Sequence, residues 1–350
     1  MTSPSRQLRR SDLTRPGIRR RRCGRGFRYL WPDSGPVRDP LALTRIRALV
    51  IPPAWEDVWI CPHPAGHIQA VGTDAAGRRQ YRYHDRWRQL RDERKHDRVL
   101  EFATALPRVR KVLGRHLAGE ELSRERVLAA ALRLIDLGFF RPGGEEYAED
   151  NGTFGLATIL REHVKISNRQ LVFGYPGKGA KLQERAIADE AVYAVIRSLK
   201  RRRGGGQQLL TYRSGRYWRG VSAAQINDYL RDITGGDFTA KDFRTWHATV
   251  LAAVALAVSR PAAASPAARK RAVARALREV ADYLGNTPAV ARASYVDPRV
   301  ITLYEQGLTI EPALAGIGVG REFGDLATHG HAESAVLKIL RSAANGSGAR

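Results

Sequence analysis

The residues best suited to chemistry lie at 284–298, LGNTPAVARASYVDP, where Asn286 precedes Tyr295 by nine positions and Arg292 lies one helical turn before it. A phenol has a pKa of about 10, so it is a weak nucleophile at neutral pH. It becomes useful when cations and a general base help it to attack a strong electrophile. A packing or surface role is the alternative for any single tyrosine. The rest of the chain must therefore be searched for those cations.

Three further motifs carry suitable cations. Arg141 lies in FFRPGGEEY, before two glycines that would let a ligand approach the backbone closely. Lys178 lies in PGKG at a predicted hairpin turn, from which it could reach a phosphate and donate a proton. Lys241 and Arg244 lie in KDFRTWH, three residues apart and hence on one helix face. The ordinary alternatives are a closed helix end, an exposed loop lysine and a surface salt-bridge network.

The overall charge indicates a polyanionic partner. The 350 residues include 59 lysines and arginines against 35 acidic residues, a formal net charge of +24. This excess favours nucleic acid first and an anionic membrane surface second. The longest apolar run, residues 248–258, is too short to span a bilayer, and the basic N-terminus lacks the apolar segment of a signal peptide. Two cysteines, Cys23 and Cys61, argue against a disulfide framework and favour a reducing cytoplasm.

The N-terminal part predicts a tail followed by a small sheet. Residues 1–26 are rich in arginine and lack apolar periodicity, which predicts a disordered basic arm that either touches phosphates or only aids solubility. Residues 27–95 predict a β-rich domain with an antiparallel sheet and one short helix at 41–49. The expected strands are 27–31, 48–51, 58–61, 67–71 and 80–83.

One of these strands is typical of nucleic-acid contacts. Residues 77–87, GRRQYRYHDRW, interleave aromatic and basic side chains. In an alternating strand, Gln80 and the arginines face one way while Tyr81 and Tyr83 face the other. This pattern suits groove and backbone contacts, although a solvated edge strand would have a similar composition.

The rest of the chain is mainly helical, so the expected fold class is α+β. Residues 95–106 predict a linker, 96–310 a helical domain with a β-hairpin or three-stranded meander at 164–187, and 311–350 a short helix at 332–342 with a tail. Predicted helices lie at 107–117, 121–137, 188–202, 222–232, 240–259, 267–285 and 298–307.

The sequence gives little support for a metal site or a nucleotide-binding loop. Cys61, His63 and His67 are metal-ligand types, but a fourth partner is lacking in the pattern. Glycines at 316–320 follow no predicted strand, and the PGKG turn lacks the spacing of a phosphate-binding loop. We therefore predict no metal site and no cofactor.

The combined motifs resemble a known family. FFRPGGEEY, NGTFGLATIL, the PGK turn, KDFRT and GNTP…RASY occur in the order found in type IB DNA topoisomerases of the poxvirus-like branch, which includes bacterial members. IPPAWEDVW and GRRQYRYHDRW are similar to that family's small DNA-clamping domain. The resemblance covers residues 27–310. One departure is Asn286, where many members carry histidine; an amide donates a hydrogen bond but cannot move a proton.

The resemblance implies a mechanism. Tyr295 would attack a DNA phosphate to form a 3′-phosphotyrosyl bond, and Arg141, Arg244 and Asn286 would hold the non-bridging oxygens. Lys178 would protonate the leaving 5′ oxygen. Supercoils would relax and the strand would be resealed without ATP or a required metal.

The resemblance also implies how DNA is bound. Gln80, Tyr81 and Tyr83 would contact the duplex in or beside the major groove, and Tyr147 and Lys241 would contact it near the cleavage site. The expected form is a monomer that clamps the duplex, in the cytoplasm on the nucleoid.

Two other functions remain open from the sequence. A tyrosine recombinase shares the Arg–Lys–Arg–Tyr chemistry, but such enzymes usually carry histidine where this chain has Lys241. A non-enzymatic basic DNA- or RNA-binding protein would explain the charge but not the ordered motifs. Plasmid relaxation and a covalent protein–DNA adduct distinguish the three.

Overall fold

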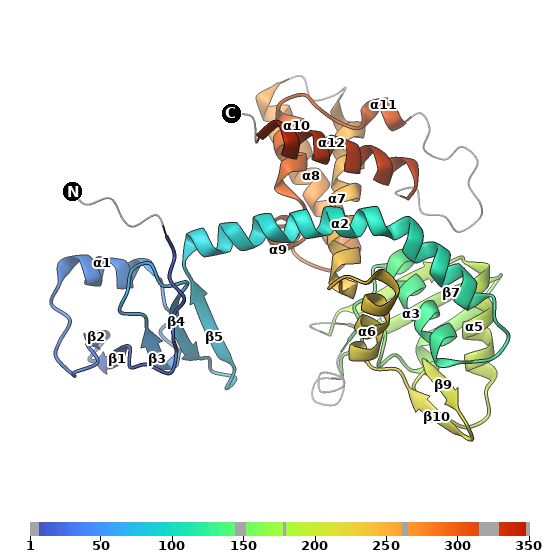
Figure 1. Cartoon of the computed structure of the whole chain (residues 1–350), viewed down its shortest axis with the longest axis horizontal. Helices are drawn as coiled ribbons and strands as arrows, with labels where there is room; N and C mark the ends of the chain where they lie inside the picture. Colours follow the sequence, from blue (N-terminus) through green and yellow to red (C-terminus); the bar gives the residue numbers. More distant parts are fainter. Residues whose placement is uncertain (1–6, 144–151, 178–179, 261–264, 315–328, 348–350) are drawn as a thin grey trace. The chain divides into compact units, whose positions relative to one another are not determined.

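The computed structural model (Figure 1) describes residues 7–143, 152–177, 180–260, 265–314 and 329–347. The chain divides into two compact units, residues 1–97 and 98–350, and each is considered by itself. Within the described ranges, no helix is long and apolar enough to cross a membrane.

The first unit is built on a five-stranded antiparallel sheet in the order β2-β1-β3-β4-β5. One face packs against helix α1 (Pro40–Ala48), whose Ile46 shares a core with Ile18, Ile60 and Ala70. On β3 the buried Val58 and Ile60 flank the half-buried Trp59, as a sheet with one covered face requires, whereas β4 is buried at five consecutive positions. The strands are β1 (Ile18–Cys23), β2 (Gly26–Leu30), β3 (Glu56–Ile60), β4 (Ile68–Thr73) and β5 (Arg79–Tyr83).

The disordered arm predicted for residues 1–26 is wrong where β1 forms an inner strand between β2 and β3. Ile18 is fully buried and anchors the strand in the core. The Arg20 guanidinium donates to the Trp55 carbonyl oxygen at 2.5 Å, and its Cζ lies 4.1 Å from the centroid of the Phe27 ring. Burial of Ile18 and the hydrogen bonding of Arg20 thus order a segment whose composition suggests disorder.

Two other local predictions in this unit are wrong. Residues 48–51, expected as a strand, contain the end of α1, because the hydrogen bonding of that helix extends to the backbone N–H of Leu49. In β5, Arg79 lies on the tyrosine face rather than with Gln80, since its Cζ is 5.9 Å from the Tyr81 ring centroid.

Helix α2 (Asp85–Leu117) is a single 33-residue helix that runs through the predicted linker. The linker at 95–106 and the helix start at Pro107 are therefore both wrong. A proline inside a helix loses one backbone hydrogen bond, and burial of apolar side chains on both sides of it offsets that loss. The buried side chains at helical spacing are Phe102, Leu106, Val109 and Leu113.

The second unit is mainly helical with two small sheets, which confirms the predicted α+β class. The three-stranded sheet β6 (Val164–Ser167), β7 (Gln170–Pro176) and β8 (Leu182–Ile187) confirms the meander, and α7 (Ala240–Ser259) has the predicted bounds. The hairpin β9 (Thr211–Ser214) and β10 (Tyr217–Gly220) was not predicted. The other helices are α3 (Arg124–Gly138), α5 (Glu190–Arg201), α6 (Ala223–Thr234), α8 (Pro266–Leu284), α9 (Pro288–Ser294), α10 (Pro298–Glu305), α11 (Glu311–Leu314) and α12 (His331–Ser347).

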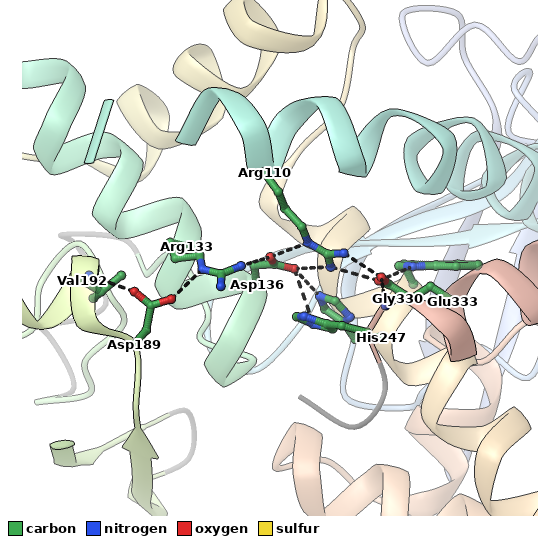
Figure 2. Close-up of polar contacts among 10 residues, drawn as sticks. Arg110, Arg133, Asp136, Asp189, Val192, His247, Gly330 and Glu333 are labelled. Atoms are coloured by element: carbon green, nitrogen blue, oxygen red, sulfur yellow. Dashed lines mark hydrogen bonds and ion pairs between the residues drawn. The ribbon is translucent and has the colours of Figure 1, made fainter. Parts of the chain in front are cut away.

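A buried ion-pair network joins the helices of this unit (Figure 2). The carboxylate of Asp136 on α3 is fully buried and accepts two hydrogen bonds from Arg110 of α2, each at 2.9 Å. It pairs with His247 of α7 at 2.9 Å and with Arg133 at 3.3 Å. Arg110 also binds Glu333 of α12 at 2.6 Å. Four helices are thereby fixed around one carboxylate.

The same cluster brings three potential metal-ligand atoms, from Asp136, His247 and His329, within 4.8 Å of one another. Both Asp136 oxygens already accept hydrogen bonds, and the guanidinium groups of Arg110 and Arg133 would repel a divalent cation. Burial alone would raise the pKa of Asp136, but Arg110, His329 and the hydrogen bond from His247 hold it well below its ordinary value. Ion pairing therefore accounts for the cluster.

The position of His329 predicts a pH-dependent stability. Burial lowers its pKa to about 3, although Asp136 acts in the opposite direction. An unfolded histidine has a pKa of about 6.5, so between these values the unfolded chain binds more protons and stability falls as pH falls. Lowering the pH from 7 to 5 should remove about 2 kcal/mol through this group. Urea unfolding of wild type and His329→Gln at both pH values measures it.

The exposed neighbour His331 supplies the matched control. His331→Gln should lose as much stability between the two pH values as wild type, whereas His329→Gln should lose less. Equal losses for all three proteins would show that His329 does not titrate in this window.

Candidate active site

The loop after α3 places Arg141 by close backbone packing. Phe139 ends the helix in the left-handed conformation, with φ of 56°. The Arg141 carbonyl oxygen then accepts from the Leu156 N–H at 2.8 Å. Gly143 and Gly155 touch: a Cβ on Gly155 would lie 2.3 Å from the Gly143 Cα. Gly143 of this motif is therefore needed for a contact between two backbones, not for ligand access alone.

Arg244 enters the site from α7 and is almost completely buried. Its guanidinium donates to the carbonyl oxygen of Phe139 and, at 2.9 Å, to that of Leu284 at the end of α8. Its Nε is buried and has no hydrogen-bond partner among the described residues. A surface salt-bridge network, the ordinary alternative for this motif, is thus wrong for Arg244.

Arg141 meets the same segment from the other side. Its NH2 group donates to the Leu284 carbonyl oxygen at 3.2 Å and to the Asn286 Oδ1 at 2.8 Å. Gly285 between them adopts φ of 62°, which turns the chain at the end of α8. The Asn286 Nδ2 is buried without a partner in the described part of the chain, so it remains available as a donor.

Tyr295 lies at the end of α9, half-buried, with its ring centroid 5.5 Å from the Arg244 Cζ. Thr249 of α7 fixes its backbone, donating to the Tyr295 carbonyl oxygen at 3.3 Å. Burial would raise the pKa of the phenol, but the charges of Arg244, Arg141 and Lys241 lower it below its ordinary value. The phenol is therefore easier to ionise than a free tyrosine.

Arg141 and Arg244 of this site also line a small pocket, to which Arg185 contributes a cation that the sequence motifs did not indicate. Arg185 of β8 lines it together with Arg141 and Arg244, and donates to the Tyr283 carbonyl oxygen at 2.7 Å. Alternation along β8 puts Arg185 on the face of Gln183, another lining residue, and this period-two pattern could have identified it. The remaining lining residues are Phe139, Phe154, Tyr175 and Gly177.

The pocket is strongly cationic. Burial lowers the pKa of Arg244 to about 10, and the nearby charge of Arg141 contributes. Among the described residues, no carboxylate forms an ion pair with either arginine. Two neighbouring guanidinium groups without a counterion form a site for an anion with several acceptor oxygens.

The remaining predicted residues of this unit are placed differently. Lys241 is exposed on the first turn of α7. Arg292 is exposed on α9 and lines a separate depression with Pro266 and Arg269. Lys178 and Tyr147 lie outside the described residues, although Gly177, which precedes Lys178, lines the pocket.

Comparison with known proteins identifies the family. Residues 84–308 match the family described as eukaryotic DNA topoisomerase I, catalytic core, and residues 26–74 match the bacterial DNA topoisomerase IB N-terminal domain. The chain belongs to the type IB DNA topoisomerase family. It is 31% identical over 296 residues to DNA topoisomerase 1B of Acanthamoeba polyphaga mimivirus, covering 83% of this chain and 88% of that protein.

Less similar relatives are also DNA topoisomerases. DNA topoisomerase 1B of vaccinia virus (strain Copenhagen) is 20% identical over 267 residues, 76% of this chain and 79% of the viral one. DNA topoisomerase 1 of Schizosaccharomyces pombe is 27% identical over 160 residues, 45% of this chain and 19% of the yeast one. In this topoisomerase the catalytic-core match contains Arg141, Arg244, Asn286 and Tyr295.

In the first unit of this topoisomerase the predicted DNA-contacting residues lie on the edge strand β5. Tyr81 and Tyr83 share one face with their rings stacked, centroids 6.1 Å apart, and Tyr81 is 39% exposed. Gln80 lies on the other face, and its amide donates to Asp74 at 2.9 Å. The edge thus presents an aromatic pair on one side and an oriented amide on the other.

The contact between Gly143 and Gly155 predicts a sensitive position. Gly155→Ala places a methyl group against backbone atoms that cannot rotate away, which shifts the loop carrying Arg141. We expect a loss of about 1–3 kcal/mol of stability and slower DNA cleavage. Chemical denaturation and single-turnover cleavage would measure the two effects.

Gly174→Ala is the control for this substitution, because a Cβ at that position of β7 meets nothing within 4 Å. It should leave cleavage unchanged. A Gly155→Ala protein as stable and as active as this control would contradict the packing argument.

Proposed function

We propose that this topoisomerase relaxes supercoiled duplex DNA by transient cleavage of one strand, with Tyr295 as the nucleophile and without ATP or a required metal. The observation that carries the proposal is the Arg244 guanidinium, which lies 5.5 Å from the Tyr295 ring and shares the Leu284 carbonyl oxygen with Arg141. Positive charge is thereby held beside a phenol whose pKa is lowered.

The proposed reaction exchanges one phosphodiester for another. The Tyr295 oxygen bonds to phosphorus while the bond from phosphorus to the 5′ oxygen breaks, leaving a 3′-phosphotyrosyl link. The phenolic proton passes to water, and Lys178, assisted by Arg141, gives a proton to the departing 5′ oxygen. Because the new bond keeps the energy of the old one, resealing reverses these steps and needs no nucleotide.

The arginines and Asn286 would stabilise the charge that builds on the non-bridging oxygens. Two observations on the described residues support this role: no carboxylate pairs with Arg141 or Arg244, and the buried Asn286 Nδ2, a hydrogen-bond donor, has no partner. Such a preorganised donor is worth roughly 2.7–4 kcal/mol in the transition state. Arg185, which lines the same pocket, is available as an additional donor.

Duplex binding would use both units. Tyr81, Tyr83 and Gln80 would contact the groove and backbone from β5, and Tyr147 and the exposed Lys241 would bind phosphates near the cleavage site. A net charge of +24 supports this partner and predicts affinity that falls steeply with salt. We further propose that one copy acts alone on nucleoid DNA in the cytoplasm.

Tyr295→Phe tests the nucleophile. The variant keeps the ring but lacks the attacking oxygen, so it should bind duplex DNA with wild-type affinity, form no covalent adduct and fail to relax plasmid. Relaxation is assayed with EDTA and without ATP, and adducts are trapped by denaturant. Tyr217→Phe, at an exposed tyrosine of β10, should behave as wild type. Relaxation by Tyr295→Phe would refute the assignment.

A series at Asn286 tests the donor. Asn286→Ala removes the Nδ2 group and should slow single-turnover cleavage roughly 10²–10³-fold. Asn286→His keeps a donor and should retain most of the rate. Asn286→Asp should be as slow as alanine, since a carboxylate would pair with Arg141 and repel phosphate. Equal rates for alanine and histidine variants would show that no donor is needed here.

A further inference from the structure

Strand β1 places two arginines, Arg19 and Arg21, on the sheet face that α1 does not cover, and β2 adds Arg28. Pairing aligns Tyr81 of β5 with Val71 of β4, Val71 with Trp59 of β3, and Trp59 with Arg19 of β1. Directly paired residues lie on the same side of a sheet. The face that α1 does not cover therefore runs from the stacked tyrosines to the arginines of the opposite edge, with the buried Val71 between them.

The arginines on this face have unusual surroundings. Arg21 of β1 lies directly opposite Arg28 of β2, and both are exposed. Like charges at such a pair destabilise a sheet. In the part of the chain that the structure describes, no carboxylate forms an ion pair with either side chain. Arg20, on the opposite face, is instead satisfied by backbone carbonyl oxygens.

Arg19 completes the group. Its guanidinium donates to the Ser34 hydroxyl at 2.8 Å, which orients it at the exposed surface beside Trp59. Three arginines thus extend over two neighbouring strands, and an anion with regularly spaced charges would remove the repulsion between them. Phosphates of a nucleic acid backbone have this property, and arginine binds them through paired N–H groups.

We propose that Arg19, Arg21 and Arg28 form a second phosphate-binding surface that lengthens the contact of the first unit with the same DNA duplex. The inference rests on the proposed function, because it takes β5 as the first contact. Neighbouring strands are about 4.8 Å apart, so β1 and β2 lie about 14–19 Å from β5 across the sheet. With about 3.4 Å per base pair, the added phosphates lie roughly 4–6 base pairs away.

Two of the three arginines, Arg19 and Arg21, lie outside the stretches that match the family models, whereas Arg28 lies within residues 26–74. Strand β1 precedes residues 26–74, and the catalytic-core match begins at residue 84. The three arginines should change the strength and length of binding, while the reaction itself belongs to the other unit.

The test is equilibrium binding to a fluorescent duplex, with full-length protein carrying Tyr295→Phe so that cleavage does not interfere. Arg21→Gln/Arg28→Gln should lower the slope of log affinity against log salt by about 1.8, since each lost phosphate contact removes about 0.9. The affinity advantage of the parent protein should then shrink about tenfold between roughly 50 and 200 mM salt. Hydroxyl-radical footprinting should show a shorter protected stretch.

Two variants separate charge at this surface from other effects. Arg21→Lys/Arg28→Lys keeps the charge and should keep the slope. Arg38→Gln/Arg47→Gln removes the same charge beside and on α1, behind the sheet, and should also keep it. The proposal would be overturned if Arg21→Gln/Arg28→Gln kept the salt slope of the parent. It would also be overturned if Arg38→Gln/Arg47→Gln lowered the slope by the same amount. If Tyr295 were wrongly assigned, the Tyr295→Phe parent would still form a covalent adduct with the duplex, which a denaturing gel detects separately from the salt slope.

Discussion

The site depends on one carbonyl oxygen that two cations share. Arg141 and Arg244 come from distant parts of the chain, and both donate to Leu284 O at the end of α8. A neutral acceptor aligns both guanidinium groups without neutralising them, whereas a carboxylate there would pair with them and exclude a phosphate. The left-handed Gly285 then directs Asn286 back toward Arg141. The two guanidinium groups are thus held in a fixed orientation and keep their positive charge for an anionic ligand.

The guanidinium groups of Arg141 and Arg244 repel each other, so their close approach requires a rigid support. The ion-pair network around Asp136 supplies it. His247 lies one helical turn beyond Arg244 on α7, and it binds the carboxylate that Arg110 also binds. Phe139, whose carbonyl oxygen accepts from Arg244, packs against the His247 ring with centroids 5.4 Å apart. Asp136 and Glu333 are therefore used behind the site, where they fix helices, and no described carboxylate lines the pocket itself.

Site residues could be predicted from the sequence where the function requires one residue type at a fixed position in a motif, and where the motifs follow a fixed order. Arg141, Arg244, Asn286 and Tyr295 were all named from such motifs, and the structure brings them together. Arg185 was missed, because its role depends on hairpin register rather than on a motif. Local errors had a common cause: composition suggested a tail at β1 and a break at Pro107, but buried contacts with distant residues decided both.

Among the described residues Arg141 and Arg244 have no counterion, and this bears on Asn286, which stands where many family members carry histidine. A histidine in contact with Arg141 at this position would be held in its neutral form, since a third positive charge added to those of Arg141 and Arg244 is unfavourable. In that form it offers one N–H donor, as the asparagine amide does. The charge needed for catalysis already comes from Arg141 and Arg244, so an amide that donates one hydrogen bond satisfies the remaining requirement. On this argument the departure from the family pattern preserves the chemistry of the site.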